Sequence, residues 1–295
     1  MSQKKPIAVV GMAGLFPGAG NIEDFWQNIL NKVDTCREVD PERWRVAPDS
    51  IYHPESQPDK AYSKRCSLIA DFKFNPAGFD INPNLLAALD PLYHIVLNVG
   101  REAIKGIPET SLNRRRTGVV LAAIALPTDA ASEITTQILG SAFEEKLFGD
   151  LAHAKLNGAA ASSSRAQYLS GRVTSLPGAV LARAFGLGGG TYTLDAACAS
   201  SLYAVKLACD ELHAHRADAM LAGGVSRPDC LFTQVGFSQL KALSPSGRCA
   251  PFDEGADGLV VGEGAGILDL KRLADALRDR DPIFGLIHGV GLSND

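Results

Sequence analysis

The sequence has no long apolar run, no surplus of one charge and no paired cysteine motif. No stretch approaches the roughly 20 apolar residues that a membrane-spanning helix needs. The 29 lysine and arginine residues stand against 33 aspartate and glutamate residues, which leaves a net charge of -4. Because this balance provides no basic face by composition, nucleic acid is not expected as the main ligand.

The first residues resemble a secretion signal and a phosphate-binding loop, but they match neither. Lys4 and Lys5 precede a short apolar run, residues 7–10, but Gly11 and Pro17 interrupt the stretch that a secretion signal would need. The glycine spacing that follows matches neither a dinucleotide-binding loop nor a Walker loop. We therefore expect a strand followed by a glycine-rich turn.

Cysteine and histidine are sparse and lack the spacing of metal ligands. No two of the six cysteines form Cys-x-x-Cys, and no histidine pair has zinc-finger spacing. His213 and His215 would not share a helix face. We expect free thiols in a reducing compartment, the cytoplasm, and no metal or cofactor in this domain.

Predicted strands alternate with predicted helices, which indicates one α/β unit with mixed strand connections. Buried strands are expected at residues 7–10, 119–125, 191–194, 219–222, 265–270 and 283–290. Helices are expected after Asn21, from Asp90-Pro91, and at residues 133–148, 177–185, 199–215 and 271–280. The helix after Asn21 should turn an inner face made of Phe25, Trp26, Ile29 and Leu30 towards the core. Residues 34–84 indicate an irregular surface excursion, and residues 158–164 have loop composition.

Cys198 stands between the strand at residues 191–194 and a helix with apolar residues almost all round its first turns. Such a helix should be buried, with its N-terminus directed at a site. Backbone N–H groups and the helix dipole there favour the nucleophilic thiolate and could hold an oxyanion. The geometry is that of a nucleophile elbow built around cysteine. From residue types alone, Cys198 could also be a small hydrophobe, as Cys209 is expected to be.

The segment Asp195-Ala-Ala-Cys198-Ala-Ser-Ser201 resembles the active-site motif of β-ketoacyl synthases. Further stretches resemble the family in the family's order, namely Pro6-Ile-Ala-Val-Val-Gly-Met12, Phe16-Pro-Gly18, Asp90-Pro91, Ala242-Leu-Ser-Pro-Ser-Gly-Arg248, Pro251-Phe-Asp253 and Gly262-Glu-Gly-Ala-Gly266. These motifs are most similar to those of the first ketosynthase of large polyketide and polyunsaturated fatty-acid synthases. The resemblance implies a layered, thiolase-like α/β fold, with residues 1–295 as its N-terminal half.

The resemblance also implies a reaction and a set of partners. Cys198 would accept an acyl chain from the phosphopantetheine of an acyl-carrier protein, and a malonyl thioester would then condense with it after losing carbon dioxide. In the family, two histidines and a lysine from the second half of the fold assist the cysteine. We expect the chain by itself to lack those histidines and to need that C-terminal half. The complete protein is expected to form a homodimer through the strand at residues 191–194.

Other titratable residues are interpreted as structural. His288 imitates a family histidine motif, but it follows Cys198 too soon. His53, His94 and His153 have no motif context. Glu263 could be a buried catalytic carboxylate, although the resemblance favours a residue that holds the glycine-rich turn.

Two other functions stay open from the sequence. One is another thiolase-fold acyltransferase, such as a thiolase or a hydroxymethylglutaryl-CoA synthase. The motifs at residues 242–252 and 262–266 argue against it. The other is a non-catalytic or split ketosynthase half that serves as an interaction subunit. The presence of Cys198 argues against a chain-length-factor-like partner, because such partners generally lose the cysteine.

Overall fold

A computed structural model describes residues 5–44, 46–108, 111–149, 172–173 and 175–293. Its main element is a six-stranded sheet with the strand order β5-β4-β6-β8-β1-β9. The strands are β1 (Ile7–Leu15), β4 (Thr117–Ala123), β5 (Thr191–Leu194), β6 (Ala219–Ser226), β8 (Gly264–Arg272) and β9 (Gly285–Ile287). β4 runs parallel to β5 and β6, whereas β8 is antiparallel to both β6 and β1. The carboxyl ends of β1, β4 and β6 therefore meet at one edge of the sheet, where β8 begins.

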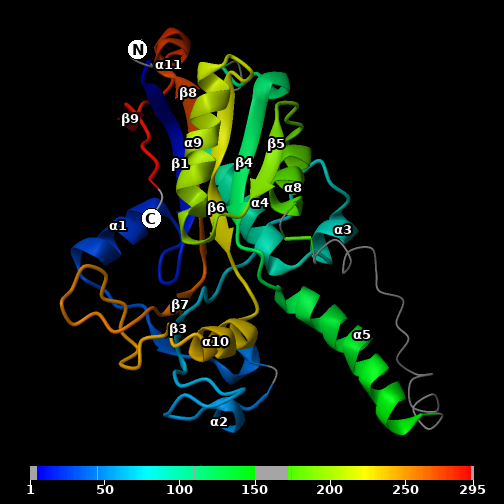
Figure 1. The fold of residues 1–295 in the computed structure, drawn as a ribbon. Helices are drawn as coiled ribbons and strands as arrows, with labels where there is room; N and C mark the ends of the chain where they lie inside the picture. Colours follow the sequence, from blue (N-terminus) through cyan, green and yellow to red (C-terminus); the bar gives the residue numbers. More distant parts are fainter. Residues whose placement is uncertain (1–4, 45, 109–110, 150–171, 174, 294–295) are drawn as a thin grey trace.

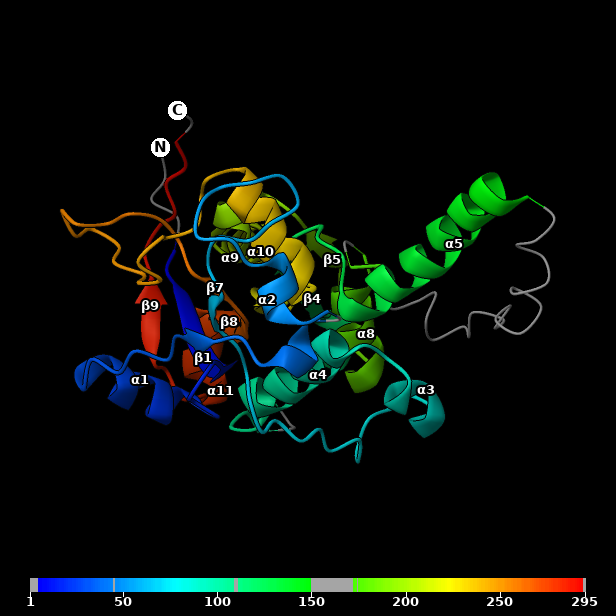
Figure 2. The same cartoon turned by 90° about the horizontal axis from the view of Figure 1, so that it is seen from below.

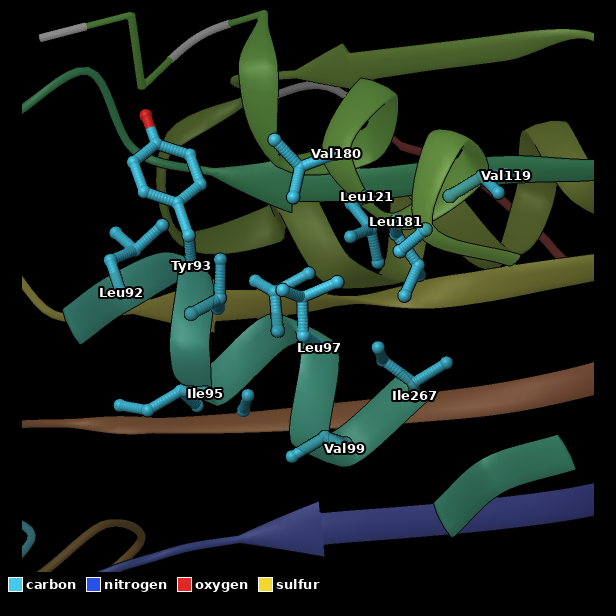
Figure 3. Packing of buried hydrophobic residues seen from close by; sticks show 14 of the residues in the cluster. Leu92, Tyr93, Ile95, Leu97, Val99, Val119, Leu121, Val180, Leu181 and Ile267 are labelled. Atoms are coloured by element: carbon cyan, nitrogen blue, oxygen red, sulfur yellow. The ribbon is translucent and has the colours of Figure 1, made fainter. Parts of the chain in front are cut away.

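Helices cover both faces of this sheet (Figure 1). On one face, α4 (Pro91–Ile104) and α8 (Leu176–Phe185) pack over β4, β6 and β8, and their side chains form the largest buried apolar cluster (Figure 3). On the other face, α9 (Ser200–His213) packs over β4 and β6. The two helices α4 and α8 approach closely at Gly100, because a Cβ there would lie 2.3 Å from Leu181 Cδ1.

The remaining elements surround the sheet. A three-stranded sheet consists of β2 (Arg37–Glu38), β3 (Arg65–Ser67) and β7 (Val261–Gly262). The other helices and helical turns are α1 (Ile22–Leu30), η1 (Pro41–Arg43), α2 (Pro48–Ile51), α3 (Pro83–Ala87), η2 (Arg114–Arg116), α5 (Asp129–Phe148), η3 (Ala197–Ala199), α10 (Cys230–Gln239) and α11 (Leu273–Asp279). α5 extends away from the body in both views (Figures 1 and 2). Within the described residues, no helix combines the length and the apolar character that crossing a membrane requires.

The expected helix starts are confirmed. Asn21 caps α1 by accepting a hydrogen bond from the Asp24 amide at 2.8 Å, and Asp90 caps α4 in the same way at Leu92. Pro91 fits the first position of α4, because the backbone N–H that proline lacks would have no partner within the helix there. Local capping chemistry therefore sets where both helices begin.

Some expectations about the fold are wrong in detail. The apolar face of α1 does not turn inward, since Trp26, Ile29 and Leu30 are each at least half exposed. Of the predicted inner face, Phe25 packs on Phe16 with ring centroids 4.4 Å apart, whereas the other three side chains are left uncovered among the described residues. The last strand, β9, has only three residues instead of the expected eight. α10 was not expected, and the loop predicted at residues 158–164 and His153 lie outside the described residues.

Asp269 lies fully buried in the centre of β8, and neither of its carboxylate oxygens has a hydrogen-bond partner among the described residues. Burial raises the pKa of this carboxyl to about 8, against the attraction of Lys271. Lys271 is itself paired with Asp279 at 2.6 Å and with Asp281 at 2.5 Å. Asp269 is therefore neutral in the folded chain at pH values where the unfolded chain ionises it.

We predict that the contribution of Asp269 to stability falls as the pH rises from about 4 to about 8, because the unfolded chain releases the Asp269 proton first. Asp269→Asn should remove this part of the slope, which is at most about 1.4 kcal/mol per pH unit for one group. The free energy of unfolding in urea at pH 5 and pH 8 measures it. Asp279→Asn is a control with the opposite sign, because Arg278 and Lys271 lower the pKa of the Asp279 carboxyl. Removing that carboxylate should therefore reduce stability at pH 8. Parallel pH profiles for Asp269→Asn and the parent protein would contradict the prediction.

Candidate active site

A pocket of about 520 Å³ opens at the edge of the sheet where β1, β4 and β6 end. Its walls come from Phe16 after β1, the end of β4, the end of β6, and the turn that begins β8 at residues 262–266. Cys198 and Ser200–Ser201 close it from the start of α9. Ligands of open α/β sheets commonly bind outside the carboxyl ends of the strands. The structure thus brings together Cys198 and the glycine-rich turn, which are more than 60 positions apart in the sequence.

Cys198 occupies a tight turn between β5 and α9. It lies in η3, its side chain is exposed, and the preceding residue Ala197 has a φ of +49°. This left-handed conformation costs a residue with a Cβ about 1–2 kcal/mol, so the surrounding contacts must hold it. A strained residue directly before the candidate nucleophile agrees with the elbow expected from the sequence.

Two side chains hold the turn. Asp195 accepts hydrogen bonds from the backbone amides of Ala197 and Ala125, both at 2.8 Å, and so joins the turn to the chain that follows β4. Ser200 donates to the Ala197 carbonyl at 2.6 Å and accepts from the Ala196 amide at 2.8 Å. These four bonds fix the backbone on both sides of Cys198.

The start of α9 has no side-chain cap, although the Ser200 amide donates to the Ala197 carbonyl of η3. Its N-cap residue, Ala199, provides no side-chain acceptor for the first amides of this 14-residue helix. Such amides and the positive end of the helix dipole stabilise negative charge. The arrangement can therefore hold an oxyanion beside the Cys198 sulfur.

The burial expected for α9 is found on one face only. Ala204, Ala208 and Leu212 are buried against the sheet, whereas Leu202 is 68% exposed. Nothing among the described residues covers the outer face of the first turns. The helix start borders the pocket, but the helix is not enclosed on all sides.

Glu263 forms part of the pocket wall and is tied to its surroundings by two arginines. Its carboxylate pairs with Arg43, lies 3.8 Å from Nε of Arg227 and accepts a hydrogen bond from the Ile69 amide at 3.0 Å. Arg227 also pairs with Asp129 at 2.8 Å and lies 3.8 Å from Asp90. These bonds engage both carboxylate oxygens, which favours the structural interpretation of Glu263.

The arginine partners of Glu263 and the serine that holds the turn were not singled out from the sequence. Arg43 is 220 positions from Glu263, so no local pattern connects them. Ser200 carried a signal, because it lies inside the motif around Cys198. Its hydrogen bonds to residues 196 and 197 give that position a physical role.

The histidines lie elsewhere. His94 stacks on Phe74 and donates from Nε2 to the Leu86 carbonyl at 2.7 Å. His213 and His288 line a separate cavity of about 210 Å³, and His213 donates to the Lys5 carbonyl. Of the residues the structure describes, no histidine lines the pocket of Cys198.

We predict that Asp195→Ala releases the turn, because the amides of Ala125 and Ala197 lose their shared acceptor. Stability should fall by about 1–2 kcal/mol, and Cys198 should react more slowly with iodoacetamide as the elbow relaxes. Asp195→Asn keeps one acceptor oxygen, so its stability and its rate of Cys198 alkylation should lie between those of the parent protein and Asp195→Ala. Asp253→Ala is a matched control, since Asp253 accepts a backbone bond from Gly255 in an exposed loop. Equal effects of Asp195→Ala and Asp253→Ala on Cys198 alkylation would contradict the prediction.

Comparisons with known proteins agree with this geometry. The family model described as "Beta-ketoacyl synthase, N-terminal domain" matches residues 4–276. A phenolphthiocerol/phthiocerol polyketide synthase from Mycobacterium bovis is 35% identical over 296 residues, which are 99% of this chain and 15% of that protein. Polyketide synthase PksL of Bacillus subtilis is 33% identical over 98% of this chain and 6% of its own length. The chain therefore spans only a small part of these relatives.

Solved structures show the same relationship. The structure titled "PfaC Keto synthase-Chain length factor" superposes with a TM-score of 0.84 at 34% identity, over 96% of this chain and 31% of that one. The ketosynthase from module 6 of the bacillaene synthase of Bacillus subtilis gives 0.74 at 31% identity, over 95% and 43%. The layered α/β fold is thus thiolase-like, and the chain belongs to the β-ketoacyl synthase family, as a ketosynthase domain of the polyketide synthase type.

Proposed function

We propose that this protein catalyses carbon–carbon bond formation as a β-ketoacyl synthase, with Cys198 as its acyl-carrying nucleophile. The observation that carries the proposal is the position of Cys198, exposed in a strained turn between the pocket and the uncapped start of α9. Thiol nucleophiles in such positions form thioesters with activated acyl groups. Membership of the family supports the same chemistry.

The first step transfers an acyl group to Cys198. The sulfur attacks the thioester carbonyl of the donor, its carbonyl oxygen becomes an oxyanion, and amides at the start of α9 stabilise that charge. The C–S bond to the donor then breaks, and the donor leaves as a thiol with the proton that Cys198 gave up. The pocket of about 520 Å³ has room for the acyl chain beside the sulfur.

The second step forms the new carbon–carbon bond. A malonyl thioester loses carbon dioxide, its enolate carbon attacks the acyl-Cys198 carbonyl, and the Cys198 thiolate leaves. Donors near the malonyl oxygen are needed for this step, and no histidine lines the described pocket. We propose that they come from the second half of the ketosynthase fold, as the family resemblance implies.

The donor and the extender are proposed to be carried on the phosphopantetheine of an acyl-carrier protein. The relatives support this because they are polyketide synthases much longer than this chain. The domain itself is proposed to need no metal or cofactor, and the assembly is proposed to work in the cytoplasm. Two alternatives are distinguished by the donor: a thiolase-like enzyme would accept acyl-CoA but not acyl-carrier protein, and a non-catalytic half would accept neither.

Cys198→Ala in the complete protein should abolish acyl loading and condensation while leaving the melting temperature nearly unchanged, because the removed thiol is exposed. Intact mass after incubation with acyl-carrier protein donor measures loading, and carbon dioxide release from malonyl-carrier protein measures condensation. Cys249→Ala is the matched control, since it removes the other exposed thiol. The 295 residues alone should load slowly and release no carbon dioxide. Loading that persists in Cys198→Ala would overturn the assignment of the nucleophile.

We also propose that the complete protein is a homodimer joined through β5. This strand is the edge of the sheet among the described residues, and all four of its residues are partly exposed. Val119 donates to the Gly190 carbonyl, so alternate residues from Gly190 face β4 and the backbone N–H of Thr193 faces the free edge. An unpaired edge of this kind is suited to a two-fold interface with a second copy.

Thr193→Pro removes that edge donor and should convert the dimer to a monomer at micromolar concentration in light scattering. Thr193→Val is the matched control, because it keeps the backbone N–H while losing the hydroxyl that accepts from the Gly178 amide at 3.0 Å. Dimers should persist in Thr193→Val. A parent protein that is monomeric, or two variants with equal dimer content, would contradict the interface.

A further inference from the structure

The pocket of Cys198 is lined almost entirely by small side chains. Eleven of its 16 lining residues are glycine, alanine or serine. Besides Cys198, the larger ones are Phe16, Ile124, Val225 and Glu263. Val225 belongs to the buried apolar core, and Glu263 is held by its arginine partners. Phe16 and Ile124 are therefore the two half-buried, bulky side chains that limit the space in the pocket.

Phe16 lies at the end of the pocket that is far from Cys198. The cysteine directly precedes α9, which packs over β4 and β6, whereas Phe16 follows β1. In the sheet, β8 separates β1 from β6. Because neighbouring strands lie about 4.8 Å apart, the ends of β6 and β1 are roughly 10 Å from each other. Ile124 follows β4 on the side of Cys198, so Phe16 is the bulky residue of the opposite end wall.

Phe16 also separates the pocket from a second cavity. This cavity has a volume of about 370 Å³, and its other walls come from Leu15, residues 18–20, residues 69–73 and Asn98. Among the described residues, Phe16 is the only one that lines both spaces. Its side chain is therefore the partition between them.

Glycines shape the slot in which the Phe16 ring lies. A Cβ at Gly14 would lie 2.4 Å from Cε2 of the ring, and a Cβ at Gly264 would lie 2.8 Å from Cδ1. Gly266 is the partner of Gly14 across β1 and β8, and a Cβ there would lie 3.6 Å from Cζ. From α1, Phe25 packs on the ring with a centroid distance of 4.4 Å. These contacts on several sides give the end wall a defined position.

We propose that Phe16 sets the length of the acyl group that Cys198 accepts, because its ring closes the far end of the pocket. The inference rests on the proposed role of Cys198 as the acyl-carrying nucleophile. An acyl chain that starts at the sulfur and follows the ends of the strands reaches the ring after roughly 10 Å. A chain that ends there is accommodated, whereas a longer one must displace the ring from a packed slot. Without the ring, the chain continues into the second cavity.

The first test uses thiol reagents, so that it does not depend on catalysis. The complete protein is treated with N-ethylmaleimide, N-hexylmaleimide or N-dodecylmaleimide, and peptide mass spectrometry measures the labelling rates of Cys198 and Cys249. Cys249 is exposed and does not line the pocket, so the ratio of the two rates corrects for the reactivity of each reagent. In Phe16→Ala this ratio should rise about tenfold for the dodecyl reagent and stay unchanged for the ethyl reagent.

The second test uses acetyl-, hexanoyl- and dodecanoyl-acyl-carrier protein as donors, and intact mass measures the loading of Cys198. Phe16→Ala should raise the rate with the dodecanoyl donor relative to the acetyl donor about tenfold. Phe16→Leu keeps an apolar side chain in the slot and should raise this ratio less. Phe232→Ala is the matched control, because it removes an exposed ring of α10 that lines neither cavity. Its ratio should equal that of the parent protein.

Phe16→Leu decides the proposal even if Phe16→Ala fails to fold. Phe16 variants that keep the chain-length preference of the parent protein in both tests would overturn the role of Phe16, as would an equal shift in Phe232→Ala. A parent protein whose Cys198 reacts with the maleimides but takes up no acyl group would instead overturn the proposed function. The two failures are therefore distinguished by the parent protein alone.

Discussion

Charge pairing at the buried carboxylate of Glu263 is the interaction that joins the glycine-rich wall of the pocket to the rest of the fold. It joins Arg43 of η1, Arg227 after β6 and the backbone at Ile69, and through Arg227 it reaches the starts of α4 and α5. Residues 34–84, which contain Arg43, are therefore not the irregular surface excursion expected from the sequence, because they supply β2, β3 and buried side chains. Taking away one partner of such a buried ion cluster typically costs about 3–5 kcal/mol, because an unpaired charge remains. The glycine-rich turn can therefore form a pocket wall without side-chain bulk, since charge pairing holds it in place.

The turn around Cys198 is stabilised by a different set of contacts. The strain at Ala197 is offset by three short-range hydrogen bonds of Asp195 and Ser200, and by one that Asp195 accepts from the Ala125 amide after β4. The nucleophile is therefore positioned locally, whereas the opposite wall is positioned by charges far apart in the sequence. A substitution on one side should change the pocket without moving the other.

Much of the fold could be predicted because it depends on short-range signals. Buried apolar runs placed the strands, capping residues placed the starts of α1 and α4, and the motif around Cys198 placed the turn. α10 escaped prediction because its apolar residues do not gather on one face, and β2 and β7 are too short to show alternation. The exposed side chains of α1 show the limit of periodicity, which indicates an apolar face but not what covers it. The Glu263 cluster depends on contacts that only the folded chain creates.

The position of β1 in the sheet has a consequence for biosynthesis. This first strand is paired on one side with β8 and on the other with β9, so both partners are made long after β1 itself. At about 5–20 residues per second, ribosomes would need roughly 10–50 s between completing β1 and completing β8. During that interval an apolar strand with two open edges is exposed to chaperones and to other nascent chains. The strand order that assembles the pocket thus also leaves β1 unpaired during most of the synthesis of this domain.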